Sequence, residues 1–379
     1  MTKLFIVVNV DWFFLSHRKD IALSAQKIGY KVTIITKDTG RKSDIEALGV
    51  EVIDLPMNRS GKNLVEELRT YWFLYHLYCS EKPDIVHHVG LKVVLWGTLA
   101  AKLAKIDGVV NAISGLGVFF SEENKSLVLK LLPKVLRFSH CRKNLAVIFQ
   151  NEEDKSLFFQ NGIIKEEQAF MIKGSGVNLN QYCYTPETPK GKIRVLLTAR
   201  MIVEKGIFVL VDAALKLKGR YGDTVEFLLC GGLDDNPNAI KGEELKAVCD
   251  GKYIQWLGYR TDVLELLKSC HIVAFPSYYK EGLPKSLIEA TAVGRPIVTT
   301  ISIGCKEAVV DGYNGYLIPI KDSSALADKL QILFEDEVLR QMMGQNSRNL
   351  AEKDFSIENV VAKHLDIYKM LLDGDLCNY

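Results

Sequence analysis

Short apolar segments alternate with longer amphipathic ones along most of this 379-residue chain. Apolar runs separated by stretches long enough for a crossover helix are typical of parallel strands that helices cover on both faces. The candidate crossover helices of the first half include residues 17–28, 63–79 and 92–105. The predicted strands are 3–8, 31–36, 51–55, 84–88, 109–113 and 145–149 in the first half, and 192–199, 225–230, 253–257, 271–275 and 296–300 in the second.

One segment interrupts this alternation with Gly, Asn and Pro: residues 173–192, KGSGVNLNQYCYTPETPKGK. Such a composition predicts a linker, and the chain is too long for one ordinary core. We therefore predict an α/β fold of two doubly wound parallel-sheet domains, 1–175 and 176–379, with the alternative that a last helix, about 357–372, packs back on the first domain. Ligands of such sheets bind beyond the carboxyl ends of the strands, so the cleft between the domains is the expected site.

Composition excludes several classes of protein. The net charge of +2 gives no overall attraction to nucleic acid, and eight scattered cysteines without a C-x-x-C pair argue against a zinc site or a disulfide framework. The N-terminal run MTKLFIVVNVDWFF predicts a buried strand and not a signal peptide. No apolar run approaches the roughly 18 residues of a membrane span. We expect a cytoplasmic protein, soluble or peripheral to a membrane.

The stretch YYKEGLPKSLIEA, residues 278–290, carries two glutamates around a Gly-Leu-Pro turn. Pro284 suits the first position of a helix. Glu281 is then expected on the turn after strand 271–275, and Glu289 about a turn and a half inside the helix. An acidic surface beside a proline-started helix is the alternative.

The start of the same helix is a candidate anion site. Free backbone N–H groups attract anions, so a phosphate is expected beside Gly282 and Leu283. A glycosidase pair is a poor interpretation of Glu281 and Glu289, because hydrolysis needs carboxylates on opposite sides of one bond and these follow a single strand-turn-helix unit.

The stretch TARMIVEKG, residues 198–206, follows the first strand of the second domain. Arg200 and Lys205 flank this loop, and Gly206 lets the backbone turn closely. Two cations at the carboxyl end of a parallel strand suit a diphosphate, which Arg binds bidentately. A pair of exposed loop cations is the alternative, and it weakens because Glu281 follows an adjacent strand of the same predicted sheet.

Two further loops follow strands of the second domain. In LGYRTDVLELL (257–267), Tyr259 and Arg260 are candidates to flank a nucleobase, although Asp262 could be only the N-terminal acid of a helix. The adjacent aspartates of GGLDDNPN (231–238) predict a turn in preference to a metal site. We expect no obligatory metal and no cofactor.

Three of these stretches resemble a known family when taken in order and spacing. TARMIVEKG, FPSYYKEGLPKSLIEATAVGRPIV and DGYNGYLI are similar to the nucleotide-sugar domain of glycosyltransferase family 4, and the similarity covers nearly all of residues 190–335. Members of this family are retaining enzymes of the GT-B fold. The resemblance implies that Arg200 and Lys205 bind the donor diphosphate, that Glu289 binds ribose hydroxyls, and that Glu281 binds the donor sugar. The backbone of Gly282 and Leu283, before Pro284, would assist; Leu283 stands where the family commonly has Phe.

The first half is similar, more weakly, to family members that extend lipid-linked bacterial oligosaccharides. Ser114 stands where many relatives have His before Gly-Leu-Gly, and two adjacent histidines replace the usual H-x-H. Adjacent strand residues face opposite ways, so one of the two histidines has the alternative of a satisfied buried residue. The candidates for the acceptor or donor-sugar side are His17, Arg18, Arg59, His87, His88, Lys92, Gly115 and Gly117.

A basic segment at 124–143, NKSLVLKLLPKVLRFSHCRK, contains six Lys or Arg and no acid. Lys130, Lys134 and Arg137 fall on one helical face, which is the pattern of an interfacial helix drawn to anionic lipid. The alternative is a core-packed helix with a basic outer face. Pro133 is expected to kink or divide the helix.

Together these features predict a retaining glycosyltransferase. Its expected donor is a UDP-sugar, with an N-acetylhexosamine suggested by the resembling subgroup, and its acceptor a polyprenyl-diphosphate-linked saccharide in bacterial O-antigen or capsule assembly. The expected location is the inner face of the plasma membrane, on an anionic lipid surface. A nucleotide-sugar epimerase of the same fold and a non-catalytic nucleotide-sugar-binding protein are the alternatives.

Overall fold

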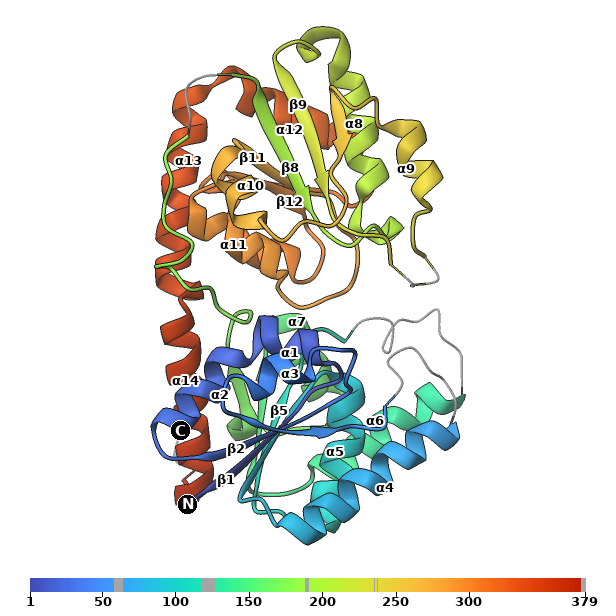
Figure 1. The fold of residues 1–379 in the computed structure, drawn as a ribbon, viewed down its shortest axis with the longest axis vertical. Helices are drawn as coiled ribbons and strands as arrows, with labels where there is room; N and C mark the ends of the chain where they lie inside the picture. Colours follow the sequence, from blue (N-terminus) through green and yellow to red (C-terminus); the bar gives the residue numbers. More distant parts are fainter. Residues whose placement is uncertain (58–63, 117–126, 188–190, 235, 237, 376–379) are drawn as a thin grey trace. The chain divides into compact units, whose positions relative to one another are not determined.

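The computed structural model describes residues 1–57, 64–116, 127–187, 191–234, 236 and 238–375 (Figure 1). The chain divides into two compact units. Unit 1 comprises Met1–Ser175 together with the described part of Ile357–Tyr379, and unit 2 comprises Gly176–Ser356. The C-terminal helix α14 (Ile357–Asp373) therefore belongs to the first unit and not to the second.

Unit 1 contains a seven-stranded sheet in which every pairing is parallel, in the order β3-β2-β1-β4-β5-β6-β7. All six predicted strands of this half are present. The seventh, β7, was not predicted because it has only three residues, which are half-buried and too few to indicate a strand. The strands are β1 (Lys3–Val7), β2 (Lys31–Thr36), β3 (Glu51–Asp54), β4 (Ile85–Val89), β5 (Gly108–Ala112), β6 (Leu145–Phe149) and β7 (Ala169–Met171).

Helices cover both faces of this sheet, as a doubly wound fold requires. One core joins the sheet to α2 and α14, with Ile21 and Tyr368 among its buried residues, and the other joins it to α4, α5, α6 and α7 through residues such as Leu74 and Leu136. The helices are α1 (Asp11–His17), α2 (Lys19–Lys27), α3 (Lys42–Glu46), α4 (Leu64–Glu81), α5 (Leu91–Leu103), α6 (Leu127–His140) and α7 (Glu152–Gln160).

Unit 2 repeats the plan with six parallel strands in the order β10-β9-β8-β11-β12-β13. Chain order reverses between β8 and β11, and this switch point is where open α/β sheets bind their ligands. The fold-class prediction is thus confirmed, with β13 added to the five predicted strands. The strands are β8 (Ile193–Thr198), β9 (Val225–Cys230), β10 (Ile254–Trp256), β11 (Ile272–Phe275), β12 (Ile297–Thr300) and β13 (Gly315–Ile318).

Two cores also flank the second sheet. Leu210 of α8 and Leu330 of α12 lie in one, and Leu287 and Ile288 of α11 lie in the other. The helices of unit 2 are α8 (Ile207–Tyr221), α9 (Gly242–Val248), α10 (Val263–Ser269), α11 (Lys285–Val293), α12 (Ser323–Glu335) and α13 (Glu337–Leu350). Among the residues described, no helix has both the length and the apolarity to cross a membrane.

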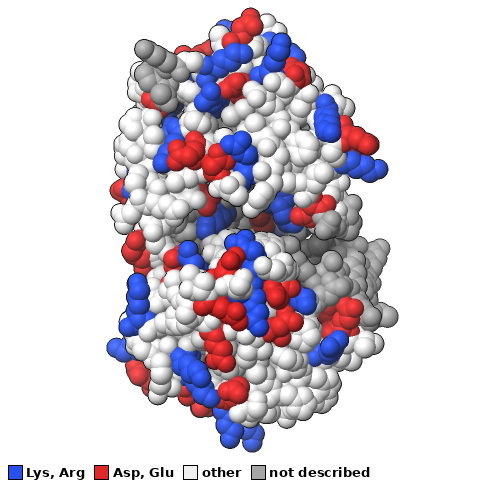
Figure 2. Space-filling view, in the orientation of Figure 1, with Lys and Arg blue, Asp and Glu red and all other residues white. Residues whose placement is uncertain are grey.

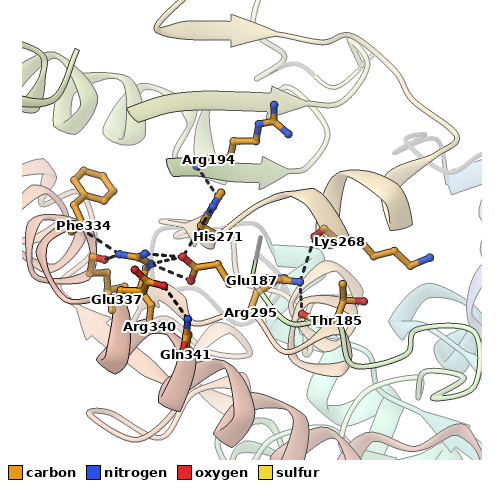
Figure 3. Close-up of polar contacts among 11 residues, drawn as sticks. Thr185, Glu187, Arg194, Lys268, His271, Arg295, Phe334, Glu337, Arg340 and Gln341 are labelled. Atoms are coloured by element: carbon orange, nitrogen blue, oxygen red, sulfur yellow. Dashed lines mark hydrogen bonds and ion pairs between the residues drawn. The ribbon is translucent and has the colours of Figure 1, made fainter. Parts of the chain in front are cut away.

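A buried ion pair fastens the segment that follows the domain boundary to helix α13 of unit 2 (Figure 3). Glu187 accepts hydrogen bonds from Arg340, at 2.5 Å from Nη2 and 3.1 Å from Nε. The Arg295 Nη2 donates to the Thr185 carbonyl at 2.6 Å. Because a buried charge is tolerated only when it is paired and hydrogen-bonded, these contacts fix the course of residues 185–187.

Candidate active site

The loop after β8 presents its two cations at the carboxyl end of the central strand of unit 2. A 3-10 turn (Val203–Lys205) leads into Gly206, whose φ of 77° is left-handed. A Cβ on Gly206 would lie 2.1 Å from the Pro276 carbonyl oxygen. Glycine is therefore required here, because only it allows the β8 loop to approach the β11 loop so closely.

Lys205 and Glu281 meet at this switch point. The Lys205 ammonium contacts the Glu281 carboxylate, and their side chains are 7% and 23% exposed. The ammonium also lies 5.2 Å from the centre of the Phe275 ring and 5.3 Å from that of Tyr279, so two aromatic faces shield it from water. The two loops that the sequence singled out are thus directly in contact.

Side chains at the end of β12 hold the loop that carries Glu281. The Thr299 hydroxyl donates to the Phe275 carbonyl at 2.6 Å, and the Ser302 hydroxyl donates to the Ser277 carbonyl at 2.9 Å. A Cβ on Gly304, which has a φ of 86°, would lie 2.3 Å from the Gly282 carbonyl oxygen. Sequence reasoning missed Gly304, although a glycine four residues beyond a predicted strand was a usable signal.

Glu289 lies on α11 and is largely buried. The Tyr182 hydroxyl donates to its Oε1 at 3.1 Å, and burial raises the pKa of the carboxyl. Tyr182 was not predicted, because it stands in the expected linker. The helix begins at Lys285, one residue later than expected: Pro284 is the extended N-cap residue, with ψ 128°.

Arg200 has a partner that the sequence did not identify. Its Nη1 donates to Asp234 Oδ2 at 2.9 Å. Asp234 lies in the loop after β9, in the stretch predicted as a turn, and its Oδ1 accepts the Asn236 N–H at 2.9 Å as an Asx turn does.

The base-side candidates lie at the end of β10. Tyr259 is exposed, and Arg260 pairs with Asp262 at 2.7 Å from Nε to Oδ1. Asp262 is the N-cap residue of α10 but makes no side-chain capping bond, since its carboxylate faces Arg260 instead.

Comparison with known proteins finds a family match for each half of the chain. Residues 185–350 match the family described as glycosyl transferases group 1, and residues 3–151 match glycosyl transferase 4-like. An N,N'-diacetylbacillosaminyl-diphospho-undecaprenol alpha-1,3-N-acetylgalactosaminyltransferase of Campylobacter jejuni is 30% identical, over 90% of this chain and 92% of its own length. The chain belongs to glycosyltransferase family 4.

Two further likenesses agree with this family. A UDP-Gal:alpha-D-GlcNAc-diphosphoundecaprenol alpha-1,3-galactosyltransferase of Escherichia coli is 25% identical to this glycosyltransferase, over 89% of each chain. The crystal structure of Anabaena HepE in complex with UDP matches 97% of this chain and 100% of its own, with 19% identity and a TM-score of 0.77. The fold is therefore GT-B.

Both histidines of β4 are buried in this glycosyltransferase. His87 Nδ1 lies 2.7 Å from the Tyr368 hydroxyl of α14. On the opposite face of the sheet, His88 Nε2 lies 2.9 Å from the Tyr78 hydroxyl and His88 Nδ1 lies 2.9 Å from Asn111 Oδ1. The alternative of a satisfied buried residue, offered for one of the two, fits His88, because both of its ring nitrogens have partners. His87 is buried too, but its Nε2 has no hydrogen-bond partner among the described residues.

The His88 contact extends into a buried polar chain that reaches α6. Asn111 Nδ2 lies 3.0 Å from His140 Nε2, and His140 Nδ1 lies 2.9 Å from the Leu136 carbonyl. Burial, the largest effect, lowers the pKa of His88 and of His140 to about 4. Both imidazoles are therefore neutral near pH 7, and the chain fixes α6 to β4 and β5.

The other candidates of unit 1 near α1 and α5 have partners within the unit. Arg18 is buried, its Nη1 donates to the His17 carbonyl at 2.9 Å, and burial lowers its pKa to about 10. His17 stacks on Phe13 with ring centres 4.2 Å apart. Lys92 pairs with Glu67 at 2.5 Å.

The remaining candidates lie beside or within segments that the structure does not describe. Gly115 has a φ of 107°, which is left-handed. Arg59, Gly117 and the side chain of Lys130 lie outside the residues that the structure describes.

The basic helix α6 runs from Leu127 to His140 with Pro133 inside it, so the proline does not divide the helix. A proline removes one backbone hydrogen bond, and the helix retains the bonds of its other turns. Lys134 and Arg137 are exposed, and the Arg137 Nη2 donates to the Asn161 carbonyl at 2.6 Å.

Proposed function

We propose that this glycosyltransferase moves a sugar from a UDP-sugar to a hydroxyl of a polyprenyl-diphosphate-linked saccharide, with retention of anomeric configuration. The observation that supports this most is the meeting of Lys205 and Glu281 at the switch point of unit 2. Arg200 follows the same strand as Lys205, and Glu289 lies one turn into the helix behind Glu281. A diphosphate and a sugar need these two kinds of group side by side.

The proposed chemistry uses fixed positive charge. The departing diphosphate gains negative charge as the bond to the sugar breaks, and Arg200, Lys205 and the N–H groups at the start of α11 stabilise that charge without reorganisation. An ammonium has three N–H donors, so contact with Glu281 leaves Lys205 able to donate to phosphate as well. Glu281 binds sugar hydroxyls and Glu289 binds the ribose. The attacking hydroxyl approaches the same face from which the diphosphate leaves, and the leaving phosphate accepts its proton.

The names of the relatives support the acceptor and the donor. The Campylobacter and Escherichia coli proteins are both named for substrates on diphospho-undecaprenol, and the second is named for UDP-Gal. HepE was crystallised with UDP. By analogy we assign this chain to bacterial surface polysaccharide assembly, with an N-acetylhexosamine as the first donor sugar to test.

The direct test incubates the purified protein with a panel of UDP-sugars, with and without a polyprenyl-diphosphate-linked saccharide. If the protein transfers the sugar, the products are a longer acceptor and released UDP. An epimerase would change the UDP-sugar without acceptor, and a binding protein would bind it unchanged. Either result would contradict the proposal.

We also propose that unit 1 contacts an anionic membrane, where the acceptor lipid would reside. Leu132 and Leu136 of α6 are buried in the core of unit 1, so α6 offers its basic face, including Lys134 and Arg137, and not its apolar side. Apolar groups are available on α4, which packs on α5 as α5 packs on α6. Val65, Leu68 and Trp72 are exposed there, and few charged side chains lie over α4 at the lower right of Figure 2.

The membrane proposal predicts sedimentation with anionic liposomes. Trp72→Ser should weaken binding to vesicles of any charge, since interfacial Trp contributes apolar area. Lys134→Glu with Arg137→Glu should weaken binding to anionic vesicles only, and high salt should mimic it. The proposal fails if the unaltered protein does not sediment with anionic vesicles.

A further inference from the structure

The loop that follows β9 runs alongside the loop that carries the two cations. The Met201 N–H donates to the Gly232 carbonyl at 3.1 Å, and the Ile240 N–H donates to the Met201 carbonyl at 2.9 Å. The Val203 N–H donates to the Asn238 carbonyl at 3.0 Å. Through these backbone bonds Gly232, Asn238 and Ile240 support the loop that carries Arg200 and Lys205.

Asp234 is the fixed member of its pair with Arg200. One carboxylate oxygen is held by the Asn236 backbone N–H, and the other accepts from Arg200. The Asp234 and Arg200 side chains are 19% and 34% exposed. A free arginine side chain has many rotamers and therefore loses much conformational entropy when it is ordered, whereas a short aspartate held by a backbone hydrogen bond loses little. The aspartate therefore restricts the arginine, and not the reverse.

We propose that Asp234 is a positioning residue that holds the Arg200 guanidinium in the orientation which receives the donor diphosphate. The inference rests on the proposed function, because it presupposes a nucleoside diphosphate at Arg200. Asp234 engages Nη1, and a guanidinium has five N–H donors, so donors remain for phosphate oxygens. Ordering Arg200 before the donor arrives removes part of the entropic penalty of binding.

Electrostatic repulsion between Asp234 and the diphosphate would change UDP affinity in the opposite direction. The Asp234 carboxylate also repels a diphosphate, and if repulsion outweighed ordering, removal of the carboxylate would tighten binding. Ordering acts through Arg200 and the β-phosphate, so a ligand without that phosphate should respond little.

The chain offers a matched control pair on the two strands that precede these loops. Arg194, at the start of β8, pairs with Glu226 of β9 at 2.6 Å, and their side chains are 45% and 15% exposed. This pair has the same charges as Arg200–Asp234 and a similar N–O distance, but it joins β8 and β9 at their amino ends, whereas Arg200–Asp234 joins the loops that follow the carboxyl ends of these strands. Glu226→Gln thus reports the effect of losing a β8–β9 ion pair away from the proposed site.

The test measures UDP and UMP affinity by calorimetry on the full chain and on Asp234→Asn, Asp234→Ala and Glu226→Gln, with circular dichroism to confirm folding. We expect Asp234→Ala to weaken UDP binding about tenfold and UMP binding less than about threefold, with Glu226→Gln unchanged. Asp234→Asn, which keeps an oxygen acceptor, should lie between. In an Arg200→Ala background, Asp234→Ala should have no further effect.

Two kinds of result would overturn the inference. Unchanged or tighter UDP binding by Asp234→Ala, or equal losses for UDP and UMP, would remove the positioning role and leave the proposed function intact. Failure of the unaltered protein to bind UDP would overturn the inference together with the UDP donor proposal. The two failures are therefore distinguishable.

Discussion

The contact between Lys205 and Glu281 yields a prediction that separates stability from function. We consider Glu281→Gln, Lys205→Met and the double variant. Removing one partner of a fully buried ion pair costs about 3–5 kcal/mol, because the other charge is left unpaired. Glu281 is 23% exposed, so water partly solvates its carboxylate when the lysine is absent. We therefore expect each single change to destabilise unit 2 by about 2 kcal/mol, with Glu281→Gln the larger effect since Lys205 is only 7% exposed.

The double variant should recover most of that stability and none of the activity. Methionine has nearly the length of the lysine stem and packs well against the Phe275 and Tyr279 rings. Exchange of a buried ion pair for uncharged groups of similar volume is often neutral, so we expect a residual loss below about 1 kcal/mol. Transfer should nevertheless fall about 10²–10³-fold in all three variants, the range for removing one preorganised group from a developing charge.

Hydrogen exchange read by mass spectrometry provides the stability assay, because peptides from β8 and β11 report unit 2 while peptides from β1 and β4 serve as an internal reference. Transfer is followed by chromatography of the extended acceptor. Two results would refute the reasoning: a double variant as unstable as the worse single variant, or Glu281→Gln with the transfer rate of the unaltered protein.

Three further predictions concern Tyr182, acid stability and metals. Tyr182→Phe removes a hydrogen bond to the buried Glu289 carboxylate that is worth about 1.5–3 kcal/mol, so calorimetry should show roughly tenfold weaker UDP binding. Tyr184→Phe is the control. Equal UDP affinities of Tyr182→Phe and the unaltered protein would argue against ribose binding by Glu289. The pKa of about 4 for His88 and His140 lies below the value of about 6.5 expected when unfolded, so the folded state binds fewer protons between these values and the free energy of unfolding should fall as pH drops through this window. Urea titrations at pH 7.5 and pH 5 should give free energies of unfolding that differ by up to about 2 kcal/mol per histidine, and equal urea midpoints at the two pH values would contradict this. Transfer should persist in EDTA, because side-chain cations stabilise the diphosphate, and activity that returns only with added Mg²⁺ or Mn²⁺ would show otherwise.

The strands could be predicted because the residues of a buried strand are themselves apolar, so the signal lies within a short stretch of sequence. Runs such as IVAF of β11 are apolar throughout, since helices cover both faces of the sheet. β7 is apolar as well, but its run of three half-buried residues is too short to indicate a strand. The order of strands in each sheet was not readable from single runs, since pairing joins segments that are distant in the chain.

The sequence predicted the main residues of the candidate site but not which residues they contact. Arg200, Lys205, Glu281 and Glu289 were identified from their loops and from the family resemblance. Their partners were only partly identified: Lys205 contacts Glu281 across 76 positions, Arg200 contacts Asp234 across 34, and Glu289 contacts Tyr182 across 107. Asp234 was noted only as part of a turn, and Tyr182 only as part of a linker.

By itself, the sequence determined two parallel-sheet domains and the residue types that line the carboxyl ends of their strands, because apolar runs and strand-end loops are local features. Only the tertiary structure decided that both β4 histidines are buried and that Asp234 and Tyr182 hold site residues. Whether a polar side chain faces a site or a core depends on which distant segments pack against it, and that information resides in strand order and helix packing.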